Sequence, residues 1–212
     1  MPTNSSRQSI LQKISFAGKR RMIFDEVHNT NSDKIYKPIL PDAITCFKNE
    51  LDSINGQCFV CENEFDLYSK LNLFVQHNHF PFLYSRDSYI TNALKTYSIP
   101  FSTNETDFEG MQAGITGCEF LIARTGSVMV SSASVSGRQM YVFPPVHIVL
   151  AHVSQLVNYP EDALIAIQEK YGESIPSSIS TITGPSRTAD IEKTLVLGAH
   201  GPKEFIVFLC KE

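Results

Sequence analysis

The stretch Val146-His147-Ile148-Val149-Leu150-Ala151 carries the information that decides the fold class. Five of its six residues are apolar, and polar residues do not alternate with them. Such a run is typical of a strand buried on both faces, as strands are in a parallel sheet with helices on either side. We therefore predict that Val146–Ala151 is a strand of such a sheet.

Strand and helix signals alternate on either side of this stretch. The predicted strands span residues 57–61, 80–84, 120–124, 128–131 and 205–209, and the predicted helices span residues 64–77, 87–97 and 160–171. The alternation, with one hairpin around Thr125-Gly126-Ser127, predicts an α/β fold that is a three-layer sandwich with a mostly parallel sheet.

Residues 1–42 have a different composition from the rest of the chain. They are polar and mixed in charge, and two prolines, Pro38 and Pro41, lie near their end. We predict a helical N-terminal extension and linker over residues 1–42, and one α/β domain over residues 43–212.

The overall composition excludes several classes of partner. The chain has 212 residues, is 42% hydrophobic and carries a net charge of −4, which argues against nucleic acid or an anionic membrane as its main partner. It contains no apolar run of about 20 residues and no hydrophobic signal-peptide core near the N-terminus. Its five scattered cysteines fit a reducing compartment, so we expect a cytoplasmic protein.

The C-terminal run Ile182–Glu192, followed by Gly198–Pro202, contains the most distinctive polar turn. We predict a strand, a turn at Gly184, and then a short helix capped by Ser186 or Thr188 and ending before Gly198. Hydroxyl groups, a guanidinium and the free N–H groups of a helix start would meet there, and these groups can bind an anion.

A purely structural interpretation of this turn is also open. Ser186 or Thr188 could serve only as the helix cap, and Arg187 could pair with Asp190 or Glu192 on the surface. Both acidic residues would also occupy the favourable electrostatic field at the helix start, in competition with a bound anion.

Five motifs in order resemble the lactate-utilisation (LUD) domain family. They are Gly114–Gly117, Ile122–Ser127, Phe143–Val149, Thr183–Glu192 and His200–Pro202. The resemblance implies a fold similar to ribose-phosphate isomerase, glucosamine-phosphate deaminase and coenzyme A transferase. It also implies a role in oxidising L-lactate to pyruvate beside iron–sulfur partner subunits, and it leaves the catalytic residues of this subunit unknown.

The resemblance also bears on the hairpin turn and on one histidine. In folds of this superfamily, loops at strand ends hold phosphate through backbone N–H and hydroxyl groups, although a plain hairpin with a serine-rich surface explains the turn equally well. His200, in the last of these motifs, is the one histidine that we predict for a site, where a structural hydrogen bond is the competing role. The predicted site for a small carboxylate or phosphate consists of Thr125, Gly126, Ser127, Gly184, Ser186, Arg187, Thr188, Asp190 and His200.

Cys58 and Cys61 have the Cys-x-x-Cys spacing, but on a predicted strand. Residues three apart on a strand point to opposite faces, so we interpret both as core residues. No metal site, dinucleotide-binding motif or phosphate-binding loop is evident, so we expect no cofactor in this chain and iron–sulfur clusters only in partner subunits.

Two functions of different class remain. In the first, the chain is a non-cluster subunit of an L-lactate-oxidising system. In the second, it is a stand-alone enzyme or binder with an anion pocket for a sugar phosphate or a coenzyme A ester. The sequence shows no obvious carboxylate nucleophile at a strand end, with Glu119 the nearest candidate, and this favours the first function.

Overall fold

A computed structural model describes residues 3–18, 37–188 and 196–212. The chain divides into two compact units, Met1–Lys37 and Pro38–Glu212. The first unit contains α1 (Thr3–Gly18), a helix within the predicted N-terminal extension. None of the helices in these ranges is long and apolar enough to cross a bilayer.

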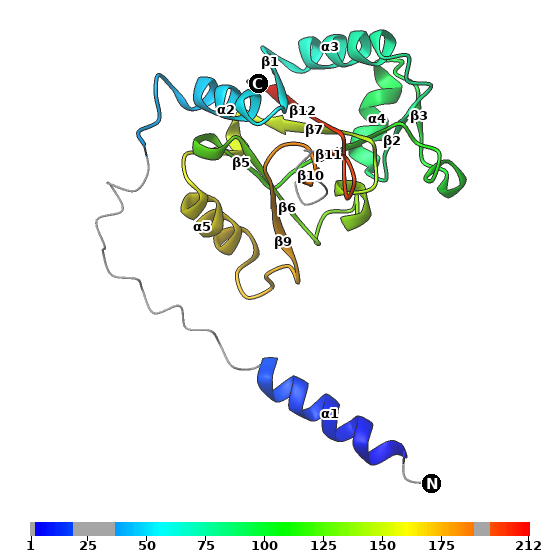
Figure 1. The fold of residues 1–212 in the computed structure, drawn as a ribbon, viewed down its shortest axis with the longest axis vertical. Helices are drawn as coiled ribbons and strands as arrows, with labels where there is room; N and C mark the ends of the chain where they lie inside the picture. Colours follow the sequence, from blue (N-terminus) through cyan, green and yellow to red (C-terminus); the bar gives the residue numbers. More distant parts are fainter. Residues whose placement is uncertain (1–2, 19–36, 189–195) are drawn as a thin grey trace. The chain divides into compact units, whose positions relative to one another are not determined.

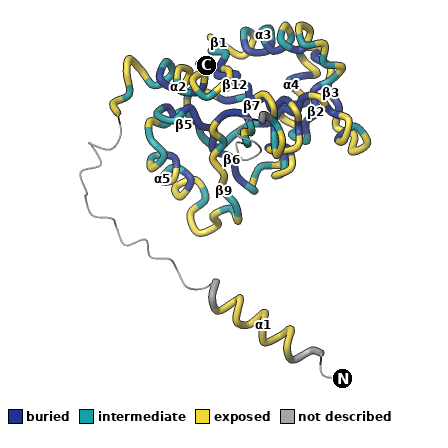
Figure 2. The backbone as a smooth tube through the Cα atoms, in the orientation of Figure 1, coloured by how far each residue is buried: buried dark blue, intermediate teal, exposed yellow. Residues whose placement is uncertain are grey.

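The second unit is built on a six-stranded sheet in which every neighbouring pair is parallel (Figure 1). The strand order is β1-β12-β7-β4-β2-β3. The strands are β1 (Gln57–Cys61), β2 (Leu83–Tyr84), β3 (Phe101–Ser102), β4 (Ala113–Thr116), β7 (Val146–His152) and β12 (Glu204–Cys210). Figure 2 shows β7 and β12 as buried backbone, and the predicted strand at Val146–Ala151 is confirmed between two parallel neighbours.

Helices α3 (Glu64–His77) and α4 (Ser88–Thr96) cover one face of this sheet. Their apolar residues, such as Leu71 and Leu94, pack with Ile148 and Phe208 of the central strands. Asn63 and Asp87 cap the two helices, since their side chains accept hydrogen bonds from the backbone N–H groups of Asp66 and Tyr89. Both predicted helices are therefore present, with α3 at its predicted bounds.

A second sheet and α2 (Ala43–Ser53) cover the opposite face. This sheet has the order β8-β5-β6-β9, and α5 packs on its outer face through Ala163 and Ile167. The strands of this sheet are β5 (Phe120–Ile122), β6 (Ser127–Ser131), β8 (Leu156–Val157) and β9 (Ile179–Ile182), and α5 spans Pro160–Tyr171. The α/β class with a mostly parallel central sheet is confirmed, and the predicted hairpin forms part of this second sheet.

Short elements complete the unit. The 3₁₀ helices are η2 (Glu105–Asp107), η3 (Ala123–Thr125), η4 (Arg138–Tyr141) and η5 (Val153–Gln155). The antiparallel pair β10 (Arg187–Thr188) and β11 (Val196–Leu197) lies near the C-terminus.

The predicted C-terminal helix needs correction. Arg187 and Thr188 form a strand that pairs antiparallel with Leu197 and Val196, and this pairing takes the place of a helix start. Ser186 is therefore no helix cap, and Gly198 follows a strand, where its φ of +75° still requires the freedom of glycine. Residues 189–195, on which the rest of the predicted helix falls, lie outside the described residues.

Candidate functional site

The central sheet has a topological switch point between β2 and β4. The connection from β2 to the edge strand β3 passes through α4, on one face of the sheet. The connection from β4 to β7 runs in the opposite direction and passes through the second sheet, on the other face. In open α/β sheets, ligands bind outside the carboxyl ends of the strands at such a point. Asp87 and Gly117 follow these two strand ends, so this edge is the place to look for a site.

A polar pocket of about 260 Å³, here the Glu119 pocket, opens at this edge. The pocket draws its walls from the ends of β4 and β6, the loop after β6, and the end of α5. Its lining residues are Asp87, Gly117, Cys118, Glu119, Ser131, Ala133, Ser134, Val135, Tyr141, Lys170 and Tyr171.

Glu119 forms the centre of the pocket's hydrogen-bond network and is only 6% exposed. Its Oε1 accepts hydrogen bonds from Ser131 Oγ at 2.5 Å and from Tyr171 OH at 2.8 Å, and its Oε2 accepts one from Lys170 Nζ at 2.7 Å. Burial raises the pKa of Glu119, but the hydrogen bonds from Lys170, Ser131 and Tyr171 outweigh it, so that this pKa lies below its usual value. The carboxylate is therefore charged at neutral pH.

The lysine, tyrosine and cysteine around the Glu119 carboxylate keep their protons at neutral pH. The hydrogen bond to Glu119 raises the pKa of Lys170, which keeps its ammonium charged. Burial, together with the same carboxylate, raises the pKa of Tyr171. Burial also raises the pKa of Cys118 to about 12, so this thiol is protonated and a poor nucleophile at neutral pH.

A smaller pocket of about 160 Å³ continues along the same edge and shares Asp87, Gly117 and Cys118 with the Glu119 pocket. It extends the polar lining to the ends of β1 and β7 with Glu64 and His152. The carboxyl edge therefore carries two adjoining cavities.

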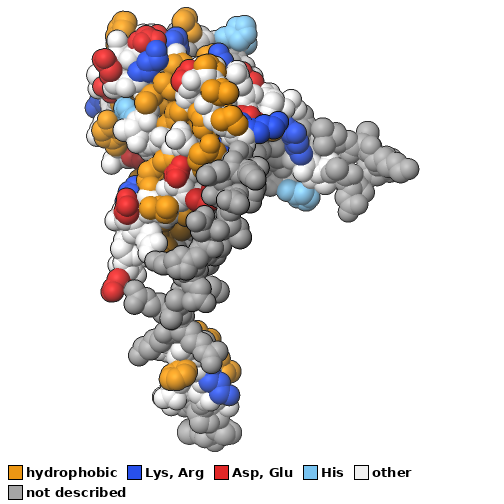
Figure 3. Space-filling model, turned by 90° about the vertical axis from the view of Figure 1, so that its left-hand side faces the viewer, with side chains coloured by type: hydrophobic (Ala, Val, Ile, Leu, Met, Phe, Trp, Pro, Cys, Tyr) orange, Lys and Arg blue, Asp and Glu red, His pale blue; other side chains and the backbone are white. Residues whose placement is uncertain are grey.

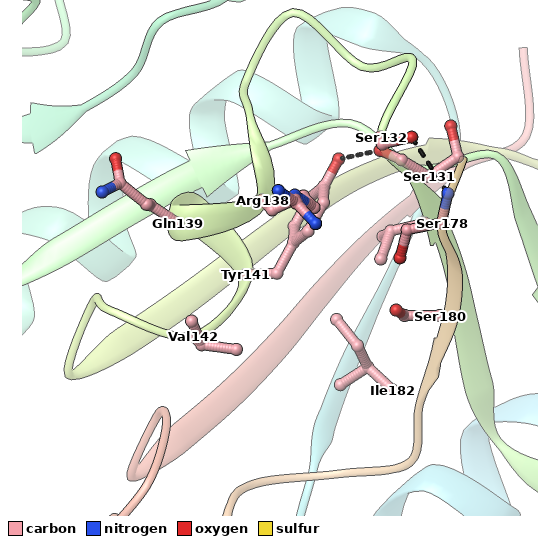
Figure 4. Close-up of a pocket in the computed structure, with 10 residues that line it drawn as sticks. Ser131, Ser132, Arg138, Gln139, Tyr141, Val142, Ser178, Ser180 and Ile182 are labelled. Atoms are coloured by element: carbon pink, nitrogen blue, oxygen red, sulfur yellow. Dashed lines mark hydrogen bonds between the residues drawn. The ribbon is translucent and has the colours of Figure 1, made fainter. Parts of the chain in front are cut away.

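A larger pocket of about 420 Å³, here the serine pocket, lies between η4 and strands β6 and β9 (Figure 4). It shares only Ser131 and Tyr141 with the Glu119 pocket, and the Tyr141 hydroxyl donates a hydrogen bond to the Ser131 carbonyl at 3.3 Å. Its lining residues are Val130, Ser131, Ser132, Arg138, Gln139, Tyr141, Val142, Ser178, Ser180 and Ile182.

The two turns of the predicted site meet in space. Ser127 Oγ and Thr183 Oγ1 are 2.9 Å apart, which joins the Thr125–Ser127 segment to the residue before Gly184. Ser127 belongs to β6, and the turn itself is η3 followed by Gly126 in the left-handed conformation. The sequence therefore located two segments that are neighbours in the fold.

Packing against α2 accounts for both glycines. A Cβ on Gly126 would lie 2.3 Å from Leu51 N, and one on Gly184 would lie 2.8 Å from the carbonyl oxygen of Ile54. Arg124 adds an ion pair of 2.9 Å to Glu50 of the same helix. These contacts explain why the turns need small residues without reference to a ligand.

Four of the remaining predicted residues lie at the amino edge of the central sheet, opposite the Glu119 pocket: Ser186, Arg187, Thr188 and His200. Ser186 N donates to the carbonyl of Pro202, shortly before β12 begins, and Gly198 N donates to the carbonyl of Ser186. Arg187 and His200 are exposed there, and Asp190 lies outside the described residues. None of the three pockets above is lined by any of the eight predicted site residues that the structure describes, so anion binding at the predicted site stays a prediction.

The sequence reasoning named Glu119 but missed its partners. Lys170 and Tyr171 are 51 and 52 residues away along the chain, and no local spacing connects them to Glu119. One signal was available: a lysine and a tyrosine close a helix that follows an acidic residue at a strand end, although many surface helices end in the same way.

The cysteines are placed as the strand pattern predicted. Cys58 packs in the core between the central sheet and the second sheet, and Cys61 packs in the core beneath α3. Burial raises the pKa of Cys58 to about 12 and that of Cys61 to about 11. Among the described residues, no group of three or more His, Cys, Asp or Glu side chains is placed to hold a metal ion.

Comparison with known proteins places these features in a family. The model of the LUD domain family matches residues 91–210. An uncharacterised protein of Neisseria meningitidis serogroup B is 39% identical over 101 residues, which cover 47% of this chain and 42% of that protein. Lactate utilization protein C of Bacillus subtilis is 38% identical over 96 residues, which cover 44% of this chain and 40% of that protein. The chain thus spans about two fifths of the length of these relatives.

A solved structure shows the same fold. The crystal structure of a DUF162 family protein from Deinococcus radiodurans superposes with a TM-score of 0.60 at 15% identity, and covers 79% of this chain and 96% of its own. Because the family model matches more than half of the chain, the resemblance found in the sequence is confirmed: the protein belongs to the LUD domain family.

Proposed function

We propose that this chain serves L-lactate utilisation as a subunit that supports oxidation of L-lactate to pyruvate together with iron–sulfur partner proteins. Relatives named lactate utilization protein C, from Bacillus licheniformis and Bacillus subtilis, support this role. Because the chain spans about two fifths of each, the activity and the partners are part of the proposal.

The Glu119 pocket is the observation that carries the proposal. It is a small polar cavity at the switch point of the sheet, of a size suited to a three-carbon hydroxy acid. Lys170 has three N–H donors, and Glu119 accepts a hydrogen bond from one of them, so the half-exposed ammonium can also pair with a ligand carboxylate.

The charges of the pocket set an expectation for affinity. Asp87 and Glu119 are negative and Lys170 is positive, so the charged residues that line it sum to one negative charge. We therefore expect the isolated chain to bind L-lactate weakly, with a Kd on the order of 1 mM or above. Weak binding by the chain alone suits a subunit that acts with partners.

The placement of the cysteines supports the assignment of the clusters to partners. Oxidation of lactate to pyruvate releases two electrons and two protons, and a cluster that accepts electrons is held by several thiolates. Cys58 and Cys61 point into different cores, which prevents them from ligating one cluster together.

A surface suited to partner contact is present on α5. Figure 3 shows hydrophobic side chains gathered on the face that lies toward the left of Figure 1, where α2 and α5 are. Leu164 and Ile165 of α5 are each 55% exposed. We propose this helix as a contact for a partner subunit.

Deletion of the gene tests the role. We expect the deletion strain to grow poorly on L-lactate as sole carbon source and normally on glucose, and the wild-type gene to restore growth on lactate. Normal growth on lactate, in a strain without a second copy, would contradict the role and favour a stand-alone enzyme or binder.

Purified protein tests the need for partners. We expect no oxidation of L-lactate by the chain with an artificial electron acceptor, and oxidation after the proposed iron–sulfur partner proteins are added. Lys170→Met should reduce this activity, because it removes the ammonium from the pocket. Glu169→Gln is the matched control, since the neighbouring residue is exposed and lines none of the three pockets. Rapid oxidation by the isolated chain would rule out the subunit role.

A further inference from the structure

We infer that the serine pocket is a second ligand site, which binds an organic anion with an apolar body larger than lactate. The inference goes beyond the proposed function, because it concerns a different cavity and can be tested by binding alone. It rests on the charge of the pocket, on the residues that form its walls, and on the contacts that position η4.

The charge of the serine pocket is opposite in sign to that of the Glu119 pocket. Among the described residues that line it, Arg138 is the only charged one. No residue that the structure describes forms a hydrogen bond or an ion pair with its exposed guanidinium. A planar guanidinium without a partner is suited to bind a carboxylate or phosphate through two parallel hydrogen bonds.

The walls of the pocket determine the rest of the ligand. Val130, Val142, Ile182 and the Tyr141 ring supply an apolar surface, and a volume of about 420 Å³ lies within the usual range for small-molecule sites. A two- or three-carbon acid would leave most of this space unfilled. The ligand class is therefore an anionic group on a ring or a branched chain.

Serine hydroxyls close the other end of the pocket. Figure 4 shows Ser131, Ser132 and Ser178 at one end, and Val142 and Ile182 at the other. Ser178 N donates a hydrogen bond to Ser132 Oγ at 3.2 Å, which holds the two segments together. Ser180 is exposed on β9, opposite Val130 in register, and can donate to the anion.

A contact from the central sheet positions η4, which carries Arg138. Arg86, just after β2, donates from NH1 to Gln139 Oε1 at 3.2 Å and from NH2 to Glu105 Oε2 at 3.0 Å. Its guanidinium also lies 4.6 Å from the centre of the Phe108 ring. These contacts occupy the Arg86 guanidinium, so Arg138 is the arginine of the two that remains available to a ligand.

Calorimetric titration with four probes tests the inference. We expect benzoate and phenyl phosphate to bind the wild-type protein with a Kd on the order of 1 mM, and acetate and benzamide to bind at least about tenfold more weakly. Acetate lacks the apolar body and benzamide lacks the charge. Phenyl phosphate against benzoate distinguishes a phosphate site from a carboxylate site.

Variants connect the binding to this pocket. Arg138→Ala should weaken benzoate binding at least about tenfold, and Arg138→Lys should weaken it less, because the charge stays but the planar fork is lost. Lys95→Ala, a change of an exposed cation that lines none of the three pockets, should have no effect. Ser180→Phe fills the pocket from an exposed strand position and should abolish binding while the melting temperature stays unchanged.

Three results would overturn the inference. They are the absence of saturable binding of both benzoate and phenyl phosphate to the wild type up to about 10 mM, binding of benzamide as tight as that of the anionic probes, and unchanged anion binding in both Arg138→Ala and Ser180→Phe.

Discussion

The amino edge and the carboxyl edge of the central sheet both gather polar residues, but use them differently. At the amino edge, Ser186 is bonded to the backbone near β12, and the turn before it packs on α2. At the carboxyl edge, Glu119 and its hydrogen-bond donors line an open cavity. The distinctive sequence motif at the amino edge is thus explained by close packing of the backbone. The candidate ligand residues at the carboxyl edge, by contrast, are common residue types that come from distant parts of the chain.

The largest expected effect is on stability, at the turn that packs on α2. In Gly126→Ala, the new Cβ would meet backbone atoms of Glu50 and Leu51 within 3 Å, at a φ of +58°. We expect a loss of about 3 kcal/mol in the free energy of unfolding, measured by urea titration. In Gly110→Ala the Cβ would have no neighbour within 4 Å, so this control should change stability by less than about 0.5 kcal/mol. A mild effect of Gly126→Ala would remove the packing explanation for the motif.

The next effect concerns the carboxyl edge. Glu119→Gln keeps the shape of the side chain but leaves Lys170 without its ion partner, and should cost about 1–3 kcal/mol in the free energy of unfolding.

The pH dependence of Glu119→Gln sharpens this test. Since the folded pKa of Glu119 lies below the ordinary glutamate pKa of 4.5, its stabilising contribution is present above that pH and is lost as the pH falls through the folded pKa. The difference in stability between wild type and variant should therefore be constant near neutrality and shrink below about pH 4.5. A difference that grows on acidification would contradict the charged network.

A smaller effect is expected from the cysteines of β1. Replacing Cys58 and Cys61 with alanine should cost about 1–2 kcal/mol through lost packing and leave lactate-dependent growth intact. Metal analysis of the purified wild type is the companion measurement. Iron or zinc that is bound by the wild type and lost in the double variant would show that these cysteines bind a metal, and would contradict their interpretation as core residues.

The smallest effect is expected at Arg187. This residue is exposed on a two-residue strand, so Arg187→Ala should change stability by less than about 0.5 kcal/mol and leave growth on lactate near the wild-type level. Arg138→Ala is the matched comparison, because it removes an exposed arginine that lines the serine pocket. Loss of growth with Arg187→Ala at unchanged stability would support the anion site predicted at the amino edge.

The sequence was informative where the physics is local. Continuous apolar runs located β7 and β12, and the helices predicted over residues 64–77 and 87–97 correspond to α3 and α4. The antiparallel pairing of Arg187 with Leu197 was missed, because capping residues and turn residues are of the same types and only the returning strand distinguishes them.

The site was predictable only in part for a related reason. Glu119 follows a strand, which its local sequence indicates, but Lys170 and Tyr171 reach it only after a hairpin and a helix have folded back. The position of a pocket depends on strand order, and strand order is not a local property.

An NMR titration of the ¹⁵N-labelled chain with L-lactate tests most directly where the ligand chemistry lies. We expect amide shifts to change at Gly117–Glu119 and at Ser131, Ala133 and Ser134, which line the Glu119 pocket, and to stay constant at Ser186–Thr188. Changes confined to Ser186–Thr188 and Gly198–Pro202, with none at Glu119, would contradict the assignment of the ligand site to the carboxyl edge.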